Sequence, residues 1–505
     1  MDTSLMSDVF AHIITFLVFC ATIVFAVRFL HRQYQLPPGP WGLPFVGCLF
    51  HLGKRPEKTF NDWVKVYGNL FSVRLGTELV VILNSQQAIK DAYIKNASTF
   101  SARPSNTVNA RLSNRKGLID APWPDWKSVR TLSTKILQDL GISRTSTEQR
   151  IYEESEYLLN ALRQLNGVPT DVSHVLMNAV SNIMCSIVFG RRFDYDDQDF
   201  KDLLLSNHVV MTKLQGSALL TFIPILWYAP MPFKKELHHH YKKLVDDVKT
   251  IIKKFRHASK NKPLSESFVN AYMTREEEYR NSKPESKYIK QHFLGDQEHL
   301  HMTVVNLFAA GTHTTAIGLL WTILFLCLNQ DIQERCFNEI KDNIGLENAP
   351  SYSDKQKLPY IEAVIMEVHR RASIVPLGLL HAVSDDVEVY GYTIPKGTMV
   401  MSNLWAVHKD EKNWERPEEF DPSRFLDGHD EIVNSERILP FSIGPRDCVG
   451  SQLAKIEFFL FLTRLLQVFK FQLPDDVRPS LDGNPGLVNT PDDFKVIASI
   501  RKQKG

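Results

Sequence analysis

The stretch Phe441–Ala454 constrains the chain most strongly, because it places one cysteine in a glycine-framed loop directly ahead of an apolar run. Cys448 follows Arg446 by two residues, and the helix-like run Leu453–Phe469 comes next. A thiolate at a helix N-terminus is stabilised by the positive end of the helix dipole and by unpaired backbone N–H groups. Such surroundings lower the pKa of a cysteine and suit a metal ligand. For a lone cysteine, the alternative is a small buried residue without chemistry.

The bulk composition excludes several classes of protein. A chain of 505 residues can form one large domain or up to three ordinary ones, and its 44% hydrophobic content supports a sizeable core. A net charge of +2 argues against a general nucleic-acid binder. The six cysteines are far apart and form no Cys-x-x-Cys pair, so neither a disulfide framework nor a zinc site is indicated. The main body is therefore expected to face the cytosol.

The N-terminus carries an apolar run, Val9–Val27, long enough to cross a membrane as a helix of about 28 Å. Acidic residues precede this run and basic residues follow it, which places its C-terminal side in the cytoplasm. A cleaved signal peptide is the alternative, but the run is long for one and no small-x-small site ends it. We expect residues 1–35 to form an uncleaved anchor, followed by the stiff proline-rich spacer Leu36–Pro44.

Further along, hydrophobic periodicity indicates a mainly helical body. A hairpin is expected at Leu70–Leu75 and Leu79–Leu83, and an irregular loop from Phe100 to Pro124. Residues 148–254 have a helical pattern broken at 167–171 and 190–199, and the charged residues 257–287 are expected to form a mobile surface segment. Asp296 can cap a long helix ending near Leu328.

Small residues interrupt the middle of that long helix. Ala310 and Thr314 are four residues apart, so Thr314 is expected to face the space that Ala310 and Gly311 leave open. The alternative for a mid-helix threonine is a hydrogen bond back to the carbonyl one turn earlier.

Two shorter motifs are weak on their own. Trp126 and Arg130 share a helix face, where an indole N–H and a guanidinium can both reach a carboxylate. Glu367 and Arg370 can pair on one helix face, as many surface residues do.

Four patterns occur in order: the proline-rich spacer, Ala-Gly-Thr-His-Thr-Thr at 310–315, Glu-x-x-Arg at 367–370, and Phe-x-x-Gly-x-Arg-x-Cys-x-Gly at 441–450. Together they resemble the cytochrome P450 family over essentially the whole chain. The spacer, Phe-Gly-Arg-Arg-Phe at 189–193 and His381 are most similar to the animal microsomal family 2-type members. The resemblance implies a mainly α fold with a smaller β-rich portion, with residues 36–505 forming one catalytic domain.

The resemblance also implies a site. Cys448 would bind the iron of haem b through its thiolate, in the loop that Phe441 opens. The haem propionates would be bound by a set of polar side chains: Arg103, Trp126, Arg130, His381 and Arg446. Thr314 and His313 would act on the oxygen side of the haem. Glu367, Arg370 and Arg424 would form the structural triad that holds the cysteine loop.

His313 departs from the family pattern, which has an acidic residue at this position. A histidine can also pass protons, so the relay can survive in altered form. Ordinary monooxygenation of a lipophilic substrate (a steroid, fatty acid or xenobiotic) is the favoured reading. An isomerase or peroxide-using enzyme, or a non-catalytic haem or lipid binder, are the alternatives that His313 motivates.

The expected partners follow from the same resemblance. Electrons would come from NADPH through NADPH-cytochrome P450 reductase, with cytochrome b5 as a further partner and no nucleic acid. The expected docking surface is basic and comprises Lys127, Arg130, Lys135 and Arg144. The protein is expected in the endoplasmic reticulum membrane with a cytosolic catalytic domain, and the apolar residues 221–233 could dip into the bilayer. The segments Val375–Leu379 and Leu487–Val488 would contact an apolar substrate.

Overall fold

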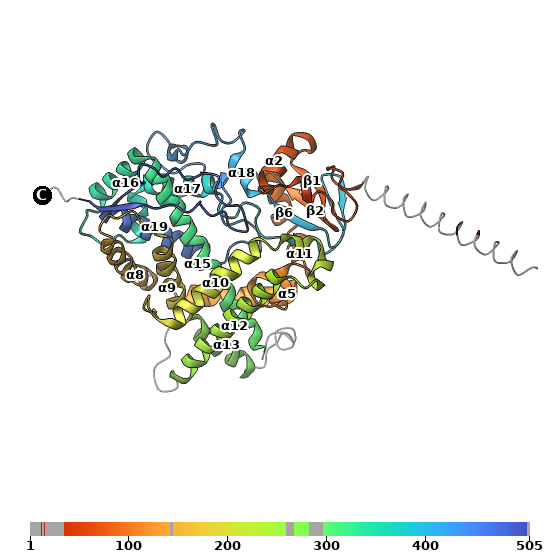
Figure 1. The fold of residues 1–505 in the computed structure, drawn as a ribbon, viewed down its shortest axis with the longest axis horizontal. Helices are drawn as coiled ribbons and strands as arrows, with labels where there is room; N and C mark the ends of the chain where they lie inside the picture. Colours follow the sequence, from red (N-terminus) through yellow and green to blue (C-terminus); the bar gives the residue numbers. More distant parts are fainter. Residues whose placement is uncertain are drawn as a thin grey trace, which may run out of the picture.

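The architecture is taken from a computed structural model that describes His12, Thr15 and residues 35–141, 145–258, 267–281 and 296–501. Apart from His12 and Thr15, the expected anchor at Val9–Val27 therefore lies outside the described residues, and so does the expected docking residue Arg144. Helices dominate the described part, and β1, β2 and β6 lie together at one side of the molecule (Figure 1). This agrees with the mainly α fold class expected from the sequence.

The β-rich region contains a mixed sheet of order β1-β2-β6-β3. Its strands are β1 (Leu70–Leu75), β2 (Glu78–Leu83), β6 (Met399–Ser402) and β3 (His381–Ala382). β1 and β2 form the expected hairpin, and β2 pairs in parallel with β6, more than three hundred residues later. Two further pairs are β4 (Val387–Val389) with β5 (Tyr392–Ile394), and β7 (Phe469–Gln472) with β8 (Ile497–Ile500).

A series of helices precedes the long central helix along the chain. They are α2 (Pro56–Tyr67), α3 (Gln86–Lys90), α4 (Ala97–Phe100), α5 (Val108–Leu112), α6 (Gly117–Asp120), α7 (Trp123–Asp139), α8 (Thr145–Gln164), α9 (Ser173–Val188), α10 (Gln198–Gln215), α11 (Ala218–Phe222), α12 (Pro232–Ala258) and α13 (Phe268–Asn281). The remaining helices are α15 (Gln297–Leu328), α16 (Gln330–Asn343), α17 (Pro359–Ala372), α18 (Leu404–Lys409) and α19 (Ser451–Val468). Short 3₁₀ turns include η3 (Pro224–Tyr228) and η6 (Pro422–Phe425).

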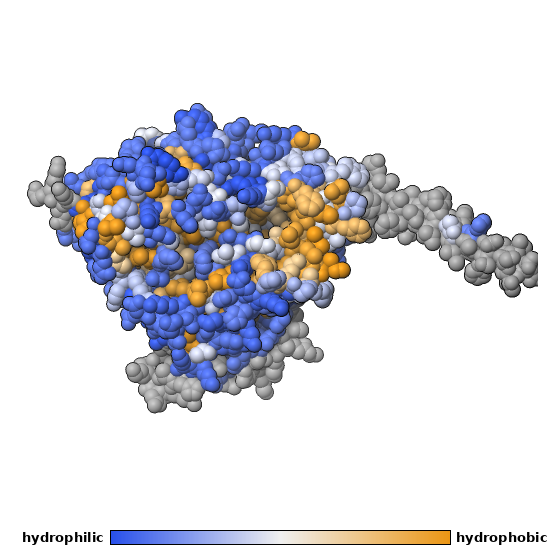
Figure 2. Space-filling model, in the orientation of Figure 1, coloured by the Kyte–Doolittle hydropathy of each residue, from blue (hydrophilic) through white to orange (hydrophobic). Residues whose placement is uncertain are grey.

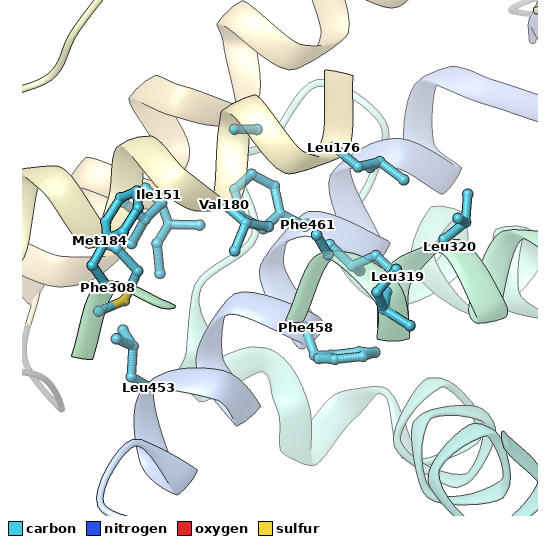
Figure 3. Close-up of a cluster of buried hydrophobic side chains, with 14 of the residues drawn as sticks. Ile151, Leu176, Val180, Met184, Phe308, Leu319, Leu320, Leu453, Phe458 and Phe461 are labelled. Atoms are coloured by element: carbon cyan, nitrogen blue, oxygen red, sulfur yellow. The ribbon is translucent and has the colours of Figure 1, made fainter. Parts of the chain in front are cut away.

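The main core forms where α8, α9, α15 and α19 meet (Figure 3). Val180 and Met184 come from α9, Phe308 comes from α15, and Leu453 and Phe461 come from α19 (Figure 3). α15 is the helix that was expected, and the carboxylate of Asp296 caps it by accepting from the N–H of Glu298. α15 is also the single helix of the described residues that is apolar and long enough to cross a membrane, and it is largely buried as a core helix instead.

Two expectations about loops need correction. Residues 100–124 are not irregular throughout, because Thr107 caps the short helix α5 and the turn α6 follows. Residues 268–281, part of the segment 257–287 that was expected to be mobile, instead form α13, which buries Phe268 and Tyr272 in the main core. Both segments have weak periodicity, and contacts with distant helices decide their structure.

Candidate active site

The cysteine loop is a tight turn closed on its own backbone. The N–H of Cys448 donates to the carbonyl of Phe441 at 3.0 Å. Gly444 has a φ of +87°, and a Cβ atom there would lie 2.3 Å from the carbonyl oxygen of Tyr93, so no other residue fits. α19 begins at Ser451, three residues after Cys448, as the sequence predicted. The side chain of Cys448 keeps accessible surface in this turn.

The expected low pKa of the Cys448 thiol is not found in the protein chain alone. Burial of the surrounding loop raises the pKa, while the N–H of Gly450 and the charge of Arg130 oppose the rise. Desolvation disfavours the thiolate more than these two groups favour it. A metal ion bound to the sulfur would itself supply the missing charge, because a coordinating thiol is deprotonated outright.

The pair of Trp126 and Arg130 does converge on the cysteine loop. Arg130 donates to the backbone carbonyl of Asp447 at 2.7 Å and forms an ion pair with its carboxylate at 2.5 Å. Trp126 is buried, and the guanidinium of Arg446 lies 4.0 Å from the centroid of its ring. Both residues of the helix motif therefore hold residues that flank Cys448.

Buried cationic side chains gather beside this loop. Arg446 donates to the carbonyls of Ser101, Ile119 and Ala121, and Arg103 donates to those of Ile119, Leu379 and Leu380. Burial, together with the charge of Arg103, lowers the pKa of Arg446 to about 8. Burial also lowers the pKa of Arg103. Two buried guanidinium groups need nearby anions to offset their desolvation and their mutual repulsion.

His381 lies next to this cationic pair. Its Nδ1 is 2.7 Å from the carbonyl oxygen of Phe100, and its ring stacks on that of Tyr93 with centroids 4.1 Å apart. Burial and the charge of Arg103 depress the pKa of His381 well below its usual value, so the ring is neutral at pH 7. His381 would then serve as a hydrogen-bonding group rather than a charge.

The middle of α15 has accessible residues, although the helix is buried on both sides of them. Ala310 is exposed, and Ala309 and Thr314 are partly exposed, within a helix whose other residues are almost all buried. The hydroxyl of Thr314 donates to the carbonyl of Ala310 at 2.7 Å, which is the alternative conformation considered from the sequence. Gly311 does not leave open space, because a Cβ atom there would lie 2.5 Å from the sulfur of Met184. Ala310 and Thr314 thus form the opening, while Gly311 admits α9.

His313, unlike Ala310 and Thr314, is buried in packed surroundings. It is 4% exposed, and neither ring nitrogen has a hydrogen-bond partner among the described residues. Burial, together with the nearby His208 of α10, lowers the pKa of His313 to about 4. The imidazole is therefore neutral at pH 7 and can accept one proton and donate another.

The structural triad assembles as the sequence predicted. Glu367 and Arg370 are fully buried and joined by two bonds of 2.6 and 2.8 Å, and Arg424 lies 3.5 Å from Glu367. Arg370 also donates to three backbone carbonyls of the segment that leads to the cysteine loop, those of His408, Pro417 and Glu419. The triad therefore braces the chain ahead of Cys448.

Sequence reasoning missed two buried acids. Asp120 lies beside Arg103 and Arg446, and Glu457 of α19 lies against Thr315 of α15. Burial raises the pKa of Glu457 to about 8, so this acid is protonated at pH 7. Glu457 is an acid within an apolar run, and this position was the sequence signal that could have indicated its burial.

These residues fit a haem. Cys448 offers an accessible sulfur, Ala310 and Thr314 offer an opening in α15, and Arg103 and Arg446 offer buried positive charge for two carboxylates. The surfaces are held near one another because α19, which follows Cys448, packs against α15, with Phe458 filling the space at Gly318. A mainly helical fold with this arrangement defines a haem-thiolate protein.

Comparison with known proteins gives the family. The cytochrome P450 family model matches residues 37–498, and the chain belongs to the cytochrome P450 family. Cytochrome P450 2U1 of Homo sapiens is 36% identical over 498 residues, covering 93% of this chain and 90% of the relative. Cytochrome P450 2J5 of Mus musculus is 35% identical over 496 residues, covering 97% of both chains. The protein is accordingly a haem b-dependent oxidoreductase of the monooxygenase type.

Proposed function

We propose that the protein inserts one oxygen atom from O₂ into a lipophilic substrate, with electrons from NADPH delivered by NADPH-cytochrome P450 reductase. The observation that carries the proposal is the accessible sulfur of Cys448 together with the opening at Ala310 and Thr314. Haem bound through a thiolate supplies O₂ activation, since electron donation from the sulfur favours O–O cleavage. The protein's own residues bind the cofactor, orient the substrate and move protons.

The predicted substrate segments support an apolar ligand. The N–H of Asn489 donates to the carbonyl of Ile374 at 2.8 Å, so the segments Val375–Leu379 and Leu487–Val488 are joined at one point. Gln215, at the end of α10, packs against Gly486 in the same C-terminal loop. Apolar side chains on segments held in this way favour a steroid, fatty acid or xenobiotic over a charged metabolite.

We assign proton handling to Thr314 and His313. The hydroxyl of Thr314 is at the opening in α15, where it can accept or donate a hydrogen bond. His313 precedes Thr314 in the chain. Its ring is neutral and has no protein partner among the described residues, so a buried water is the natural partner for its nitrogen atoms. Hydroperoxide-driven turnover without reductase is the competing function, because a neutral imidazole replaces the acid of the family pattern.

Membrane attachment has support apart from the undescribed N-terminus. Exposed apolar side chains gather over the β-rich region and α11 (Figure 2): Trp41, Leu43, Phe45, Phe50, Leu219, Ile225 and Tyr228. Two backbone hydrogen bonds join these segments, from Gly76 to Val46 and from Thr77 to Phe222. A continuous apolar surface of this kind marks an interaction with a membrane or a protein. We infer attachment to the endoplasmic reticulum membrane here as well as through residues 1–35.

A reconstituted assay tests the proposal. The purified haem protein is screened for spectral shifts with lipophilic compounds, and each binder is incubated with NADPH and reductase. Oxygenated product that requires both NADPH and reductase is expected. Product formed with hydroperoxide alone, and none with reductase, would favour the peroxide-using alternative. The absence of turnover with any spectral binder would favour a haem or lipid binder. Cytochrome b5 is added as a further arm to test it as a second partner.

A further inference from the structure

Asp120 is a buried residue at the end of α6, and its carboxylate accepts hydrogen bonds from α5 and from the residue that follows it. It is 4% exposed. One carboxylate oxygen accepts from the amide of Asn109 at 2.5 Å and from the hydroxyl of Ser113 at 3.2 Å. Asn109 belongs to α5 and Ser113 ends it. Asp120 therefore connects α5 to α6 within residues 100–124, the segment expected to be an irregular loop.

The two buried arginines enclose the backbone on either side of Asp120. Arg103 and Arg446 both donate to the carbonyl of Ile119, at 3.3 and 3.4 Å, and Arg446 also donates to the carbonyl of Ala121 at 3.0 Å. α15 holds the same turn, because the side-chain oxygen of Asn306 accepts from the N–H groups of Leu118 and Ile119. The turn at Asp120 is thus held by α5, by α15 and by both guanidinium groups.

The buried positive charge of Arg103 and Arg446 exceeds the buried negative charge of Asp120. Asp120 is the one carboxylate, among the residues that the structure describes, whose charge bears on the pKa of both Arg103 and Arg446. Burial raises the pKa of Asp120, and Arg103, the hydrogen bonds of Ser113 and Asn109, and Arg446 oppose the rise. One internal anion therefore faces two buried cations, which leaves positive charge for an anionic ligand.

We propose that Asp120 is a positioning residue that acts as the internal counter-ion of Arg103 and Arg446 and competes with the haem propionates for them. The proposal rests on the proposed function, in which these arginines bind the propionates. Two effects follow from one carboxylate. Its charge weakens the hold of the arginines on the propionates, while its hydrogen bonds to Asn109 and Ser113 keep α5 ordered.

Two substitutions separate the two effects. Asp120→Asn removes the charge and keeps an oxygen that can accept from Ser113 or Asn109. Asp120→Ala removes the charge and the hydrogen bonds together. Asp139→Asn is the control, since Asp139 is a half-exposed carboxylate on α7 that pairs with Arg275 at the surface.

The main measurement is the rate at which each haem-loaded variant loses haem to an excess of apomyoglobin. Asp120→Asn should lose haem more slowly than the wild type, on the order of tenfold, because the competing charge is gone from a buried site. Its haem reduction potential should also move to a more positive value, since loss of a nearby negative charge favours the reduced state. Limited proteolysis should cut residues 107–121 faster in Asp120→Ala than in Asp120→Asn.

The outcomes distinguish this inference from the proposed function. If Arg103→Gln and Arg446→Gln retain haem as the wild type does, the assignment of the propionates is wrong. If those variants lose haem faster while Asp120→Asn is unchanged or also faster, the competition by Asp120 is refuted. Should Asp120→Asn not fold, Arg103→Gln/Asp120→Asn should recover folded protein, because it removes one charge of each sign. Failure of that double variant to recover would also contradict the counter-ion role.

Discussion

Arg130 binds Asp447 twice, through the backbone carbonyl and through the carboxylate, so α7 is attached to the residue immediately before Cys448. The family resemblance assigned Arg130 to a haem propionate. The structure gives it a second task in the protein chain itself, which is to hold the cysteine loop in place.

Replacing Arg130 should therefore loosen the loop. Arg130→Ala should lower the free energy of unfolding by about 1–3 kcal/mol, discounted from the buried case because both side chains are partly exposed. Thermal unfolding of the haem-loaded protein measures the change. Lys135→Ala, an exposed residue on the same helix, is the control and should unfold as the wild type does. Equal stability of both variants would mean that the contact with Asp447 contributes nothing.

The buried pair of Glu367 and Arg370 should tolerate no single replacement. Either Glu367→Gln or Arg370→Ala leaves an unpaired buried group, which typically destabilises a protein by about 3–5 kcal/mol. We expect expressed protein with little haem incorporated, measured as the ratio of Soret to protein absorbance. Glu334→Gln, a partly exposed carboxylate paired with Arg501, should retain the wild-type ratio. Normal haem content in Glu367→Gln would show that the triad is dispensable.

Much of this arrangement could be read from the sequence because it is local. The capped helix α15, the hairpin β1–β2 and the cysteine turn ahead of α19 all depend on residues near one another in the chain. Contacts between distant segments were not accessible. Met184 fills the space at Gly311, and α13 is ordered by burial of Phe268 against distant helices. Asp120 gave no motif, because its partners are fixed only when α5, α15 and the cysteine loop meet.

Glu457 should make stability depend on pH. In the folded protein burial raises its pKa to about 8, against an ordinary value of 4.5. Between these two pH values Glu457 is ionised in the unfolded chain and protonated in the folded protein. The free energy of unfolding therefore falls as pH rises, by about 1.4 kcal/mol per pH unit. Below pH 4.5 the effect is absent, and above pH 8 it stays constant. The free energy of unfolding of Glu457→Gln should therefore increase relative to that of the wild type from pH 5 to pH 8.

Glu411→Gln is the matched control, because Glu411 is an exposed carboxylate. A constant difference between Glu457→Gln and the wild type across pH 5–8 would mean that Glu457 is already ionised in the folded protein.

His313 should not titrate in the physiological range. Burial and the charge of His208 hold its pKa at about 4, so its protonation state is the same from pH 6 to pH 8. The yield of product per NADPH should therefore have the same pH profile near pH 6.5 in the wild type and in His313→Asn. His313→Asp should change that yield if the residue handles protons. His429→Asn, an exposed histidine in another part of the chain, is the control. Unchanged yield and pH profile in His313→Asp would remove His313 from the proton path.

Cys448 should bind the haem iron, and the spectrum of the reduced protein under carbon monoxide tests this assignment most directly. Wild-type protein and the control Cys327→Ala should both show the red-shifted Soret band that a thiolate ligand produces. Cys448→Ala should lose that band while bound haem is still detected. A red-shifted band of normal intensity in Cys448→Ala would contradict the assignment of Cys448 as the iron ligand.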